Sequence, residues 1–303
     1  MSLNIRYSIR SVIIILLLIA FIGTVSAETW YVDNNEGSDF IKIQDAIDNA
    51  TAGDTIIVRD GTYNENVDVN KSLTIRSENG ADETTVIASN PDDHVFDVTA
   101  DYVNIIGLAV KGATEYGEAY GNAGVYLNGV NDCIVSYINA SDNVLGIHLY
   151  SSSNNTLTGN NASNNIIGIW LGHSSNNRLI SNTASSNYLG IHLTYSSNNE
   201  IINNTANSND NYGIELHHSG SNTIVNNNVK HNDKFGIYLE WRSYNNKLTN
   251  NEGAVHNEWS TIGIWAALIL VFLFVITFIG VRYYISKGRE TEEELGDEAK
   301  ILE

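Results

Sequence analysis

Near-identical units of 22 or 23 residues fill the second half of the chain. Each unit opens with Gly, then Ile or Val, a variable residue and Leu, and the opening glycines are Gly124, Gly146, Gly168, Gly190, Gly213 and Gly236. Later in each unit comes Asn, a variable residue and Leu or Ile, and then a further Asn, as at Asn155 and Asn160. A repeat of this length restricts the chain to a few solenoid architectures.

The composition of the repeat predicts strands rather than helices. Apolar residues come in alternating pairs, such as Ile147 with Leu149 and Ile169 with Leu171, which is the spacing of a strand. A leucine-rich repeat has a similar length but needs a helix-forming half, and here that half is Asn, Ser and Gly. Several short strands per unit therefore predict an all-β fold, a single-stranded parallel β-helix with one coil per repeat.

The asparagines fit a structural role in such a coil. Asn tolerates left-handed backbone angles at turns. When the same Asn recurs in every coil, its amide can also bond the coils above and below, as in a ladder. We therefore interpret the Asn-rich positions as scaffold.

The segment before the regular repeats predicts a cap and less regular coils. Apolar residues at helical spacing in 39–50 (Phe40, Ile41, Ile43, Ala46 and Ile47) predict an amphipathic helix over the first coil. The strand-like segments DTIIVRDG, SLTIRSE, TTVIAS, HVFDVTA and NIIGLAV follow. The β-helix is thus expected as irregular coils in 28–123 and regular coils in 124–253.

Two apolar segments predict export and membrane anchoring. Residues 1–27 have the basic start, apolar middle and small-residue cleavage site of a signal peptide, with an uncleaved anchor as the alternative. Residues 262–281 form an uncharged stretch of 20 residues, followed by basic residues and flanked by aromatic ones. They predict one transmembrane helix after a juxtamembrane linker at 254–261, with residues 282–303 as a cytoplasmic tail and the β-helix outside the cell.

The net charge argues against one class of partner, and the cysteine content argues against a disulfide-stabilised fold. A net charge of −19 argues against nucleic-acid binding, because phosphates require a basic surface. The single cysteine, Cys133, cannot form an internal disulfide and is expected in the apolar core.

The segment GDTIIVRDGTYNENVDVNKSLTIRSENG, followed by the G-I-x-L…N-N-x-I coils, resembles the right-handed parallel β-helix superfamily. Within it the chain looks most like the NosD-type, carbohydrate-binding and sugar-hydrolase β-helix domains of archaeal, especially methanogen, cell surfaces. The resemblance covers roughly residues 28–253. It implies a fold but no single activity, because the superfamily includes lyases, hydrolases, adhesins and the copper-site maturation protein NosD.

The variable residue of G-I-x-L is expected to point away from the core. These positions and their neighbours predict a glycan-binding strip, because rings can stack on sugars and polar side chains can bond hydroxyls. The strip consists of Tyr126, His148, Tyr150, Trp170, His192, Tyr195, Tyr238 and Trp241. Strands favour aromatic residues in any case, so a purely structural role in the envelope stays open.

Metal binding and catalysis are the alternatives. His192, Glu215, His217 and Glu240 fall on three neighbouring coils and are the candidate ligands for copper or zinc. Glu215 and Glu240 are the candidate catalytic carboxylates of a glycoside hydrolase or lyase, since they share a face in neighbouring coils. The resemblance implies calcium as the cofactor if the chain is a lyase, because lyases of that superfamily bind calcium through acidic residues.

The expected function is that of a membrane-anchored cell-surface β-helix without catalytic activity, acting as a scaffold or as a glycan-binding adhesion module. Its expected partners are the membrane and a surface polysaccharide or envelope protein. N-glycosylation sequons at Asn49, Asn70, Asn139, Asn161 and Asn203 are candidate modification sites. The alternatives are a carbohydrate-active enzyme and a NosD-like copper-handling protein.

Overall fold

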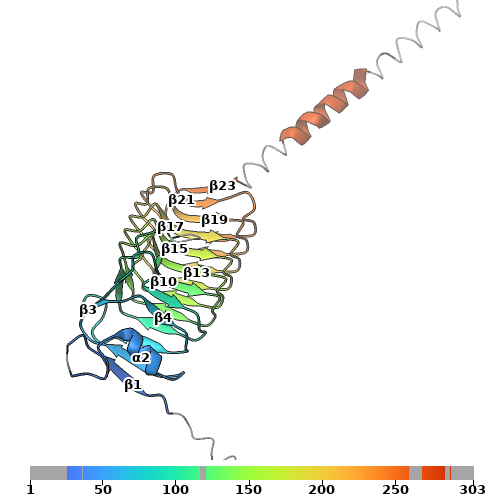
Figure 1. Cartoon of the computed structure of the whole chain (residues 1–303). Coiled ribbons are helices and arrows are strands. Elements are labelled where there is room, and N and C mark those ends of the chain that lie inside the picture. Colours follow the sequence, from blue (N-terminus) through green and yellow to red (C-terminus); the bar gives the residue numbers. More distant parts are fainter. Residues whose placement is uncertain (1–25, 36, 117–120, 259–267, 284–286, 288–303) are drawn as a thin grey trace, which may run out of the picture.

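The chain winds into a stack of coils whose strands form three parallel sheets (Figure 1). The computed structural model describes residues 26–35, 37–116, 121–258, 268–283 and 287. Every strand pairs in parallel with the equivalent strand of the next coil, so strands that are neighbours in space are one full turn apart in the sequence. The predicted all-β class and the parallel β-helix are confirmed.

The ten-stranded sheet contains β1 (Thr29–Val32), β2 (Thr55–Val58), β5 (Thr74–Ser77), β8 (Asn104–Ile106), β11 (Ile134–Ser136), β14 (Thr156–Thr158), β16 (Arg178–Ile180), β18 (Glu200–Ile202), β20 (Thr223–Val225) and β22 (Lys247–Thr249). The nine-stranded sheet contains β4 (Val67–Val69), β7 (Phe96–Val98), β10 (Ala123–Asn128), β13 (Leu145–Tyr150), β15 (Ile167–Gly172), β17 (Leu189–Thr194), β19 (Tyr212–His217), β21 (Phe235–Leu239) and β23 (Val255–Asn257). The four-stranded sheet contains β3 (Gly61–Asn64), β6 (Thr84–Ile87), β9 (Ala109–Lys111) and β12 (Asn139–Ala140).

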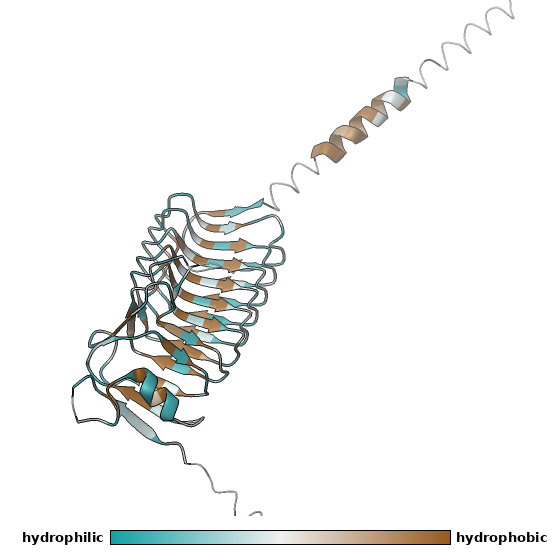
Figure 2. Ribbon diagram, in the orientation of Figure 1, coloured by the Kyte–Doolittle hydropathy of each residue, from teal (hydrophilic) through white to brown (hydrophobic). Residues whose placement is uncertain are grey.

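The register stacks each apolar residue on its equivalent in the next coil. Ile147 pairs with Ile169, which pairs with Ile191, and all three are fully buried. Figure 2 shows the resulting alternation of apolar and polar residues along the strands of the stack. Because side chains alternate across a strand, the residue between each pair of core positions faces outward. The nine-stranded sheet therefore presents one column of outward side chains along the stack.

The buried asparagines form ladders between coils. Asn177 accepts the backbone N–H of Asn155 through Oδ1 at 2.8 Å, and its Nδ2 donates to the carbonyl of Ser152 at 2.9 Å. The preceding residue, Asn176, is the one with left-handed backbone angles (φ 60°). The two roles expected of asparagine are thus divided between adjacent residues, one at the turn and one in the ladder.

The helix near the N-terminus is shorter than the expected 39–50. The helix α2 spans Ile43–Asn49 and packs against β1, β2 and β4, with Ile43, Ala46 and Ile47 buried. Phe40 is not helical, because its backbone pairs with that of Val32 at the end of β1. The carboxylate of Glu65 accepts the N–H groups of Ile43 and Gln44 and so fixes the start of the helix.

The terminal segments are described only in part. Residues 268–283 are helical, and no helix in the described part of the chain has both the length and the apolar character required to cross a bilayer. The expected linker at 254–261 is wrong in its first part, because β23 pairs with β21 and extends the stack beyond residue 253. Residues 262–267 of the expected span lie outside the described residues, as do 1–25 of the expected signal peptide, 259–261 of the linker and most of the tail.

Candidate functional site

The outward column of the nine-stranded sheet is longer than the sequence predicts. Its members, matched coil by coil through the strand register, are Asp68, Asp97, Tyr126, His148, Trp170, His192, Glu215, Tyr238 and His256. The repeat predicts the members from Tyr126 to Tyr238. The structure adds Asp68 and Asp97 at one end and His256 at the other.

Four successive rings of this column lie against one another, and His94, which precedes β7, stacks on the first of them. We call the run His94, Tyr126, His148, Trp170 and His192 the inner ring column. His94 stacks on Tyr126 with ring centroids 4.2 Å apart, and His148 stacks on Trp170 at 4.4 Å. His148 is only 2% exposed, because Tyr126 and Trp170 cover both of its faces. The expectation that His148 forms part of an exposed strip is therefore wrong.

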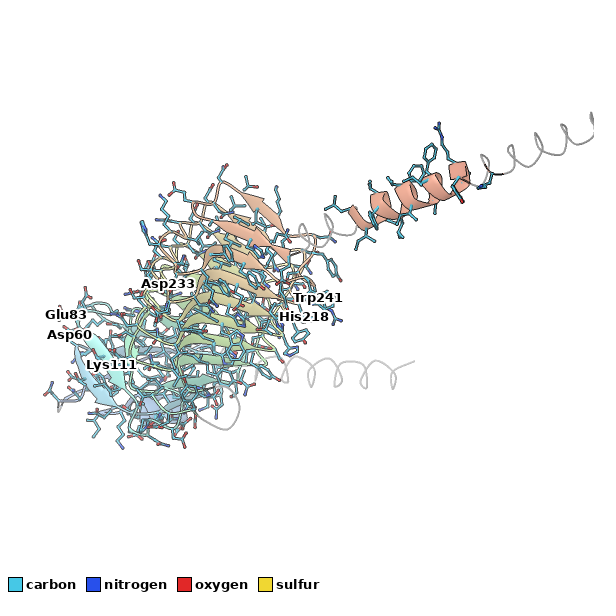
Figure 3. The ribbon with its side chains drawn as sticks, turned by 90° about the horizontal axis from the view of Figure 1, so that it is seen from above. Asp60, Glu83, Lys111, His218, Asp233 and Trp241 are labelled. Atoms are coloured by element: carbon cyan, nitrogen blue, oxygen red, sulfur yellow. The ribbon has the colours of Figure 1, made fainter. Side chains whose placement is uncertain are left out.

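A second run of rings follows the strand ends. This outer ring column consists of Tyr150, His173, Tyr195, His218 and Trp241. Tyr195 stacks between His173 at 5.1 Å and His218 at 4.9 Å, yet 51% of its surface remains exposed. Trp241 is 40% exposed, and Figure 3 shows it close to His218 on one side of the stack. Tyr195 and Trp241 are thus the exposed members of the predicted strip, and both belong to the outer ring column.

Burial keeps two histidines of the inner ring column, His94 and His148, uncharged. Burial, reinforced by the nearby His94, lowers the pKa of His148 to about 3. Burial also lowers the pKa of His94, whose Nδ1 accepts the backbone N–H of Ala123 at 2.9 Å. Burial raises the pKa of Tyr126 to about 12, and the nearby Asp97 adds to the effect. At neutral pH these stacked rings carry no charge, which suits close packing.

Two carboxyl groups lie at the N-terminal end of the column. Asp97 pairs in register with Asp68 on one side and with Tyr126 on the other. Burial raises the pKa of Asp97 to about 6, with Asp68 and Asp93 contributing, and Oδ1 of Asp97 is buried without a hydrogen-bond partner. A carboxyl group with a raised pKa beside a second carboxylate can serve as a proton donor.

The structure divides the four predicted metal ligands into two groups. His192 Nδ1 lies 2.8 Å from Oε2 of Glu215. His217 Nε2 lies 2.9 Å from Oε2 of Glu240, and His218 Nδ1 lies 3.2 Å from the same oxygen. The second group has a third candidate ligand, His218, which the sequence does not single out.

The two predicted catalytic carboxylates each contact histidine. The residue directly opposite Glu215 in the next coil is Tyr238. Glu240 comes two residues after Tyr238, so the two carboxylates are not direct neighbours in the register. Asp97 has the properties of a general acid, because one of its carboxyl oxygens is buried without a hydrogen-bond partner and burial raises its pKa to about 6.

Three site residues escaped the sequence reasoning. Asp97 and His94 both lie in the segment HVFDVTA. There Phe-Asp-Val has the same alternation as Ile-x-Leu in the repeats, but the opening glycine is missing. His218 directly follows a predicted ligand, and adjacent strand residues normally face opposite sides. His218 breaks that rule because its backbone is left-handed, with φ 51°. Applying the alternation without the glycine would have found Asp97.

The remaining predicted positions are located as follows. Asn49, Asn70, Asn161 and Asn203 are exposed, and Asn139 is half-buried. Cys133 is a buried free thiol, as expected for a core residue.

Sequence comparisons give one family and one relative. Residues 93–252 match the family described as "Right handed beta helix region". A cell surface glycoprotein of Methanothermus fervidus is 30% identical over 128 residues, which cover 42% of this chain. The match spans 20% of that relative's length.

Solved structures share the fold at low sequence identity. An alginate lyase from Paenibacillus sp. has a TM-score of 0.55 at 16% identity, covering 76% of this chain and 99% of that chain. The periplasmic alginate epimerase AlgG has a TM-score of 0.54 at 16% identity, covering 74% of this chain and 58% of that chain. At such identity the likeness establishes the β-helix alone.

Proposed function

Because the chain belongs to the right-handed β-helix family, we propose that its stack of coils is a rigid, non-catalytic support for glycan binding at a cell surface. The methanogen relative, a cell surface glycoprotein, supports the location. The glycan-contacting surface is the outer ring column together with the polar side chains beside it.

One observation carries the proposal: the rings of the outer ring column lie in adjacent coils, and Tyr195 and Trp241 remain exposed. Apolar ring surface next to imidazole and carboxylate groups is the combination that binds sugars, since rings stack on the sugar and polar groups bond its hydroxyls. A solenoid repeats this arrangement coil after coil, so the surface suits an extended polysaccharide.

Anchoring and capping complete the proposal. Residues 262–281 are apolar and uncharged, and we assign them as the single membrane span that follows the β-helix. The helix α2 lies at the N-terminal end of the stack with its apolar residues buried, so we assign it the role of covering the first coil (Figure 1). The exposed sequons are available for glycosylation.

A polysaccharide array probed with the full chain in detergent, with product analysis of each hit, tests this proposal. Binding without cleavage is the expected result. Tyr195→Ala is expected to weaken binding roughly tenfold. Tyr188→Ala alters an equally exposed tyrosine at the other end of β17 and is expected to preserve binding. Trp170 is a poorer probe, because it is packed between His148 and His192.

A carbohydrate-active enzyme is the second candidate, and Asp97 is the observation that favours it. Its raised pKa and its neighbour Asp68 provide an acid and a carboxylate in adjacent coils. Cleavage products that disappear in Asp97→Asn would establish this function in place of the first.

A further inference from the structure

Three ligand atoms converge where the nine-stranded sheet meets the following turn. His217 ends β19, His218 follows it, and Glu240 comes directly after β21 in the next coil. The nitrogens of the two imidazoles and a carboxylate oxygen of Glu240 all lie within 4.8 Å of one another. Among the described residues, these three side chains are therefore close enough together to bind one metal ion.

The contacts in this cluster are short ion-pair contacts between imidazole and carboxylate that lack hydrogen-bond alignment. His217 Nε2 and His218 Nδ1 lie 2.9 Å and 3.2 Å from Oε2 of Glu240. Nevertheless Oε2 of Glu240 and Nδ1 of His218 are both buried atoms without a hydrogen-bond partner among the described groups. The nitrogen and oxygen atoms are therefore close together but not aligned for hydrogen bonds with one another, and a shared ion would satisfy all three.

The cluster is mostly buried but is open to solvent on the side of His217. The side chains of His218 and Glu240 are 17% and 19% exposed, and that of His217 is 38% exposed. A largely buried carboxylate oxygen without a hydrogen bond is costly, and a cation in contact with it would remove that cost. The open side at His217 leaves room for water or another ligand on the ion.

We propose that His217, His218 and Glu240 bind a divalent transition-metal ion, for which zinc is the best match. Two imidazole nitrogens and one carboxylate oxygen are a common zinc ligand set with an open fourth position. Calcium and magnesium prefer oxygen ligands throughout. Tetrahedral bonds of about 2.0–2.2 Å place ligand atoms roughly 3.3–3.6 Å apart. Glu240 must therefore shift slightly outward, and the two imidazole nitrogens, which lie within 4.8 Å of each other, must adopt the same spacing.

Arg242 opposes binding in the present arrangement. Its Nη1 lies 3.4 Å from Nε2 of His218, and its guanidinium stacks over the ring of Trp241. An ion on Nδ1 of His218 leaves the proton on Nε2, where it faces the N–H groups of Arg242. Arg242 must therefore turn away when the ion binds, and Arg242→Ala is expected to tighten binding.

His192 and Glu215 provide the internal comparison. Their contact is as short, 2.8 Å, and Nδ1 of His192 also lacks an aligned hydrogen bond. This pair offers two ligands rather than three, and Nε2 of His192 already contacts Thr194 at 2.8 Å. Two ligands bind an ion far more weakly than three, so the zinc site is expected at His218 and not at His192.

The test is a calorimetric titration of zinc into the full chain, which is first treated with chelator and kept in detergent. We expect one zinc ion bound, with affinity reduced at least tenfold in His218→Ala and Glu240→Gln, since loss of groups merely behind a ligand already costs about 10- to 100-fold. His173→Ala is the matched control, because His173 also stacks on Tyr195 but lies outside the cluster.

Two outcomes overturn the proposal. One is zinc affinity unchanged in both His218→Ala and Glu240→Gln, and the other is affinity lost in His192→Ala or in His173→Ala instead. Glu240→Gln keeps the shape of the side chain, so the test survives if His218→Ala fails to fold. The inference does not depend on glycan binding, because a chain that binds zinc but no polysaccharide supports this site and contradicts the proposed function.

Discussion

The side-chain oxygen of Asn182 accepts the backbone N–H of Asn160, one coil earlier, at 3.0 Å. The amide nitrogen of Asn182 donates to the carbonyl of Leu157 in the same earlier coil at 3.0 Å. One asparagine thus satisfies a buried donor and a buried acceptor of the neighbouring coil, and the same contacts recur at Asn204.

Asn182→Ala should therefore destabilise the stack strongly. Removing the amide leaves the buried N–H of Asn160 without this acceptor and takes one hydrogen bond from the carbonyl of Leu157, at a cost of about 2–4 kcal/mol. Urea unfolding followed by circular dichroism measures the loss. Asn161→Ala, at an exposed position, is the control and should change the unfolding free energy by less than about 0.5 kcal/mol. Equal effects of the two substitutions would contradict the ladder's role.

The opening glycine of each coil is required by close approach of the backbone. A Cβ at Gly168 would lie 2.6 Å from the carbonyl oxygen of Ala162 and 2.7 Å from that of Gly190. Gly168→Ala is expected to cost about 3 kcal/mol or to prevent folding, because the backbone atoms cannot move aside. Gly172, in the same strand, has Tyr150 Cδ2 at 3.5 Å as its nearest contact. Gly172→Ala should be tolerated, and a similar loss in both variants would exclude this explanation.

The buried His148 should make the protein sensitive to acid. Its folded-state pKa, about 3, lies below the unfolded value of 6.5, so the unfolded chain binds the proton more readily. Stability is therefore lost as the pH falls below about 6.5, by about 2 kcal/mol between pH 7 and pH 5. His148→Phe keeps a ring between Tyr126 and Trp170 and should remove this part of the pH dependence. The exposed His231→Gln should not, and an unchanged pH profile in His148→Phe would contradict the assignment.

Asp97 should have the opposite pH dependence. Its folded-state pKa of about 6 lies above the reference value of 3.8, so proton binding favours the folded chain. Stability from this group is full at low pH and is lost as the pH rises from about 4 to about 6. Asp97→Asn should stabilise the protein at pH 7 by up to about 3 kcal/mol and should have little effect at pH 4. Unfolding curves at the two pH values check this, and a gain at pH 4 equal to that at pH 7 would contradict it.

The repeat predicts the coils from Gly124 onward well, because identical residues recur at identical positions and can only stack on one another. The glycines, the Ile-x-Leu pairs and the Asn ladder are all found where the pattern puts them. The start of α2 could not be predicted from local spacing, since backbone pairing of Phe40 with Val32 competes with helix formation there. Tertiary contacts decided that boundary.

The site was predicted less completely than the fold. Alternation along a strand indicates which residues face outward, but it does not say which of them cover one another. His148 faces outward and is nevertheless buried, because the neighbouring rings lie one coil spacing away and stack on it. The cluster at His218 depends on a left-handed residue after β19, a feature that a two-residue period cannot indicate.

The most direct test of the proposed function is the affinity of the full chain for the best polysaccharide from the array, measured by titration calorimetry with Tyr195→Ala and Tyr188→Ala in parallel. These tyrosines are equally exposed and lie at the two ends of one strand, but only Tyr195 belongs to the outer ring column. Loss of one stacking ring should weaken binding by about 1–2 kcal/mol, or roughly tenfold, in Tyr195→Ala, and Tyr188→Ala should bind like the unaltered chain. Equal affinity for all three proteins would contradict the claim that this column binds glycan.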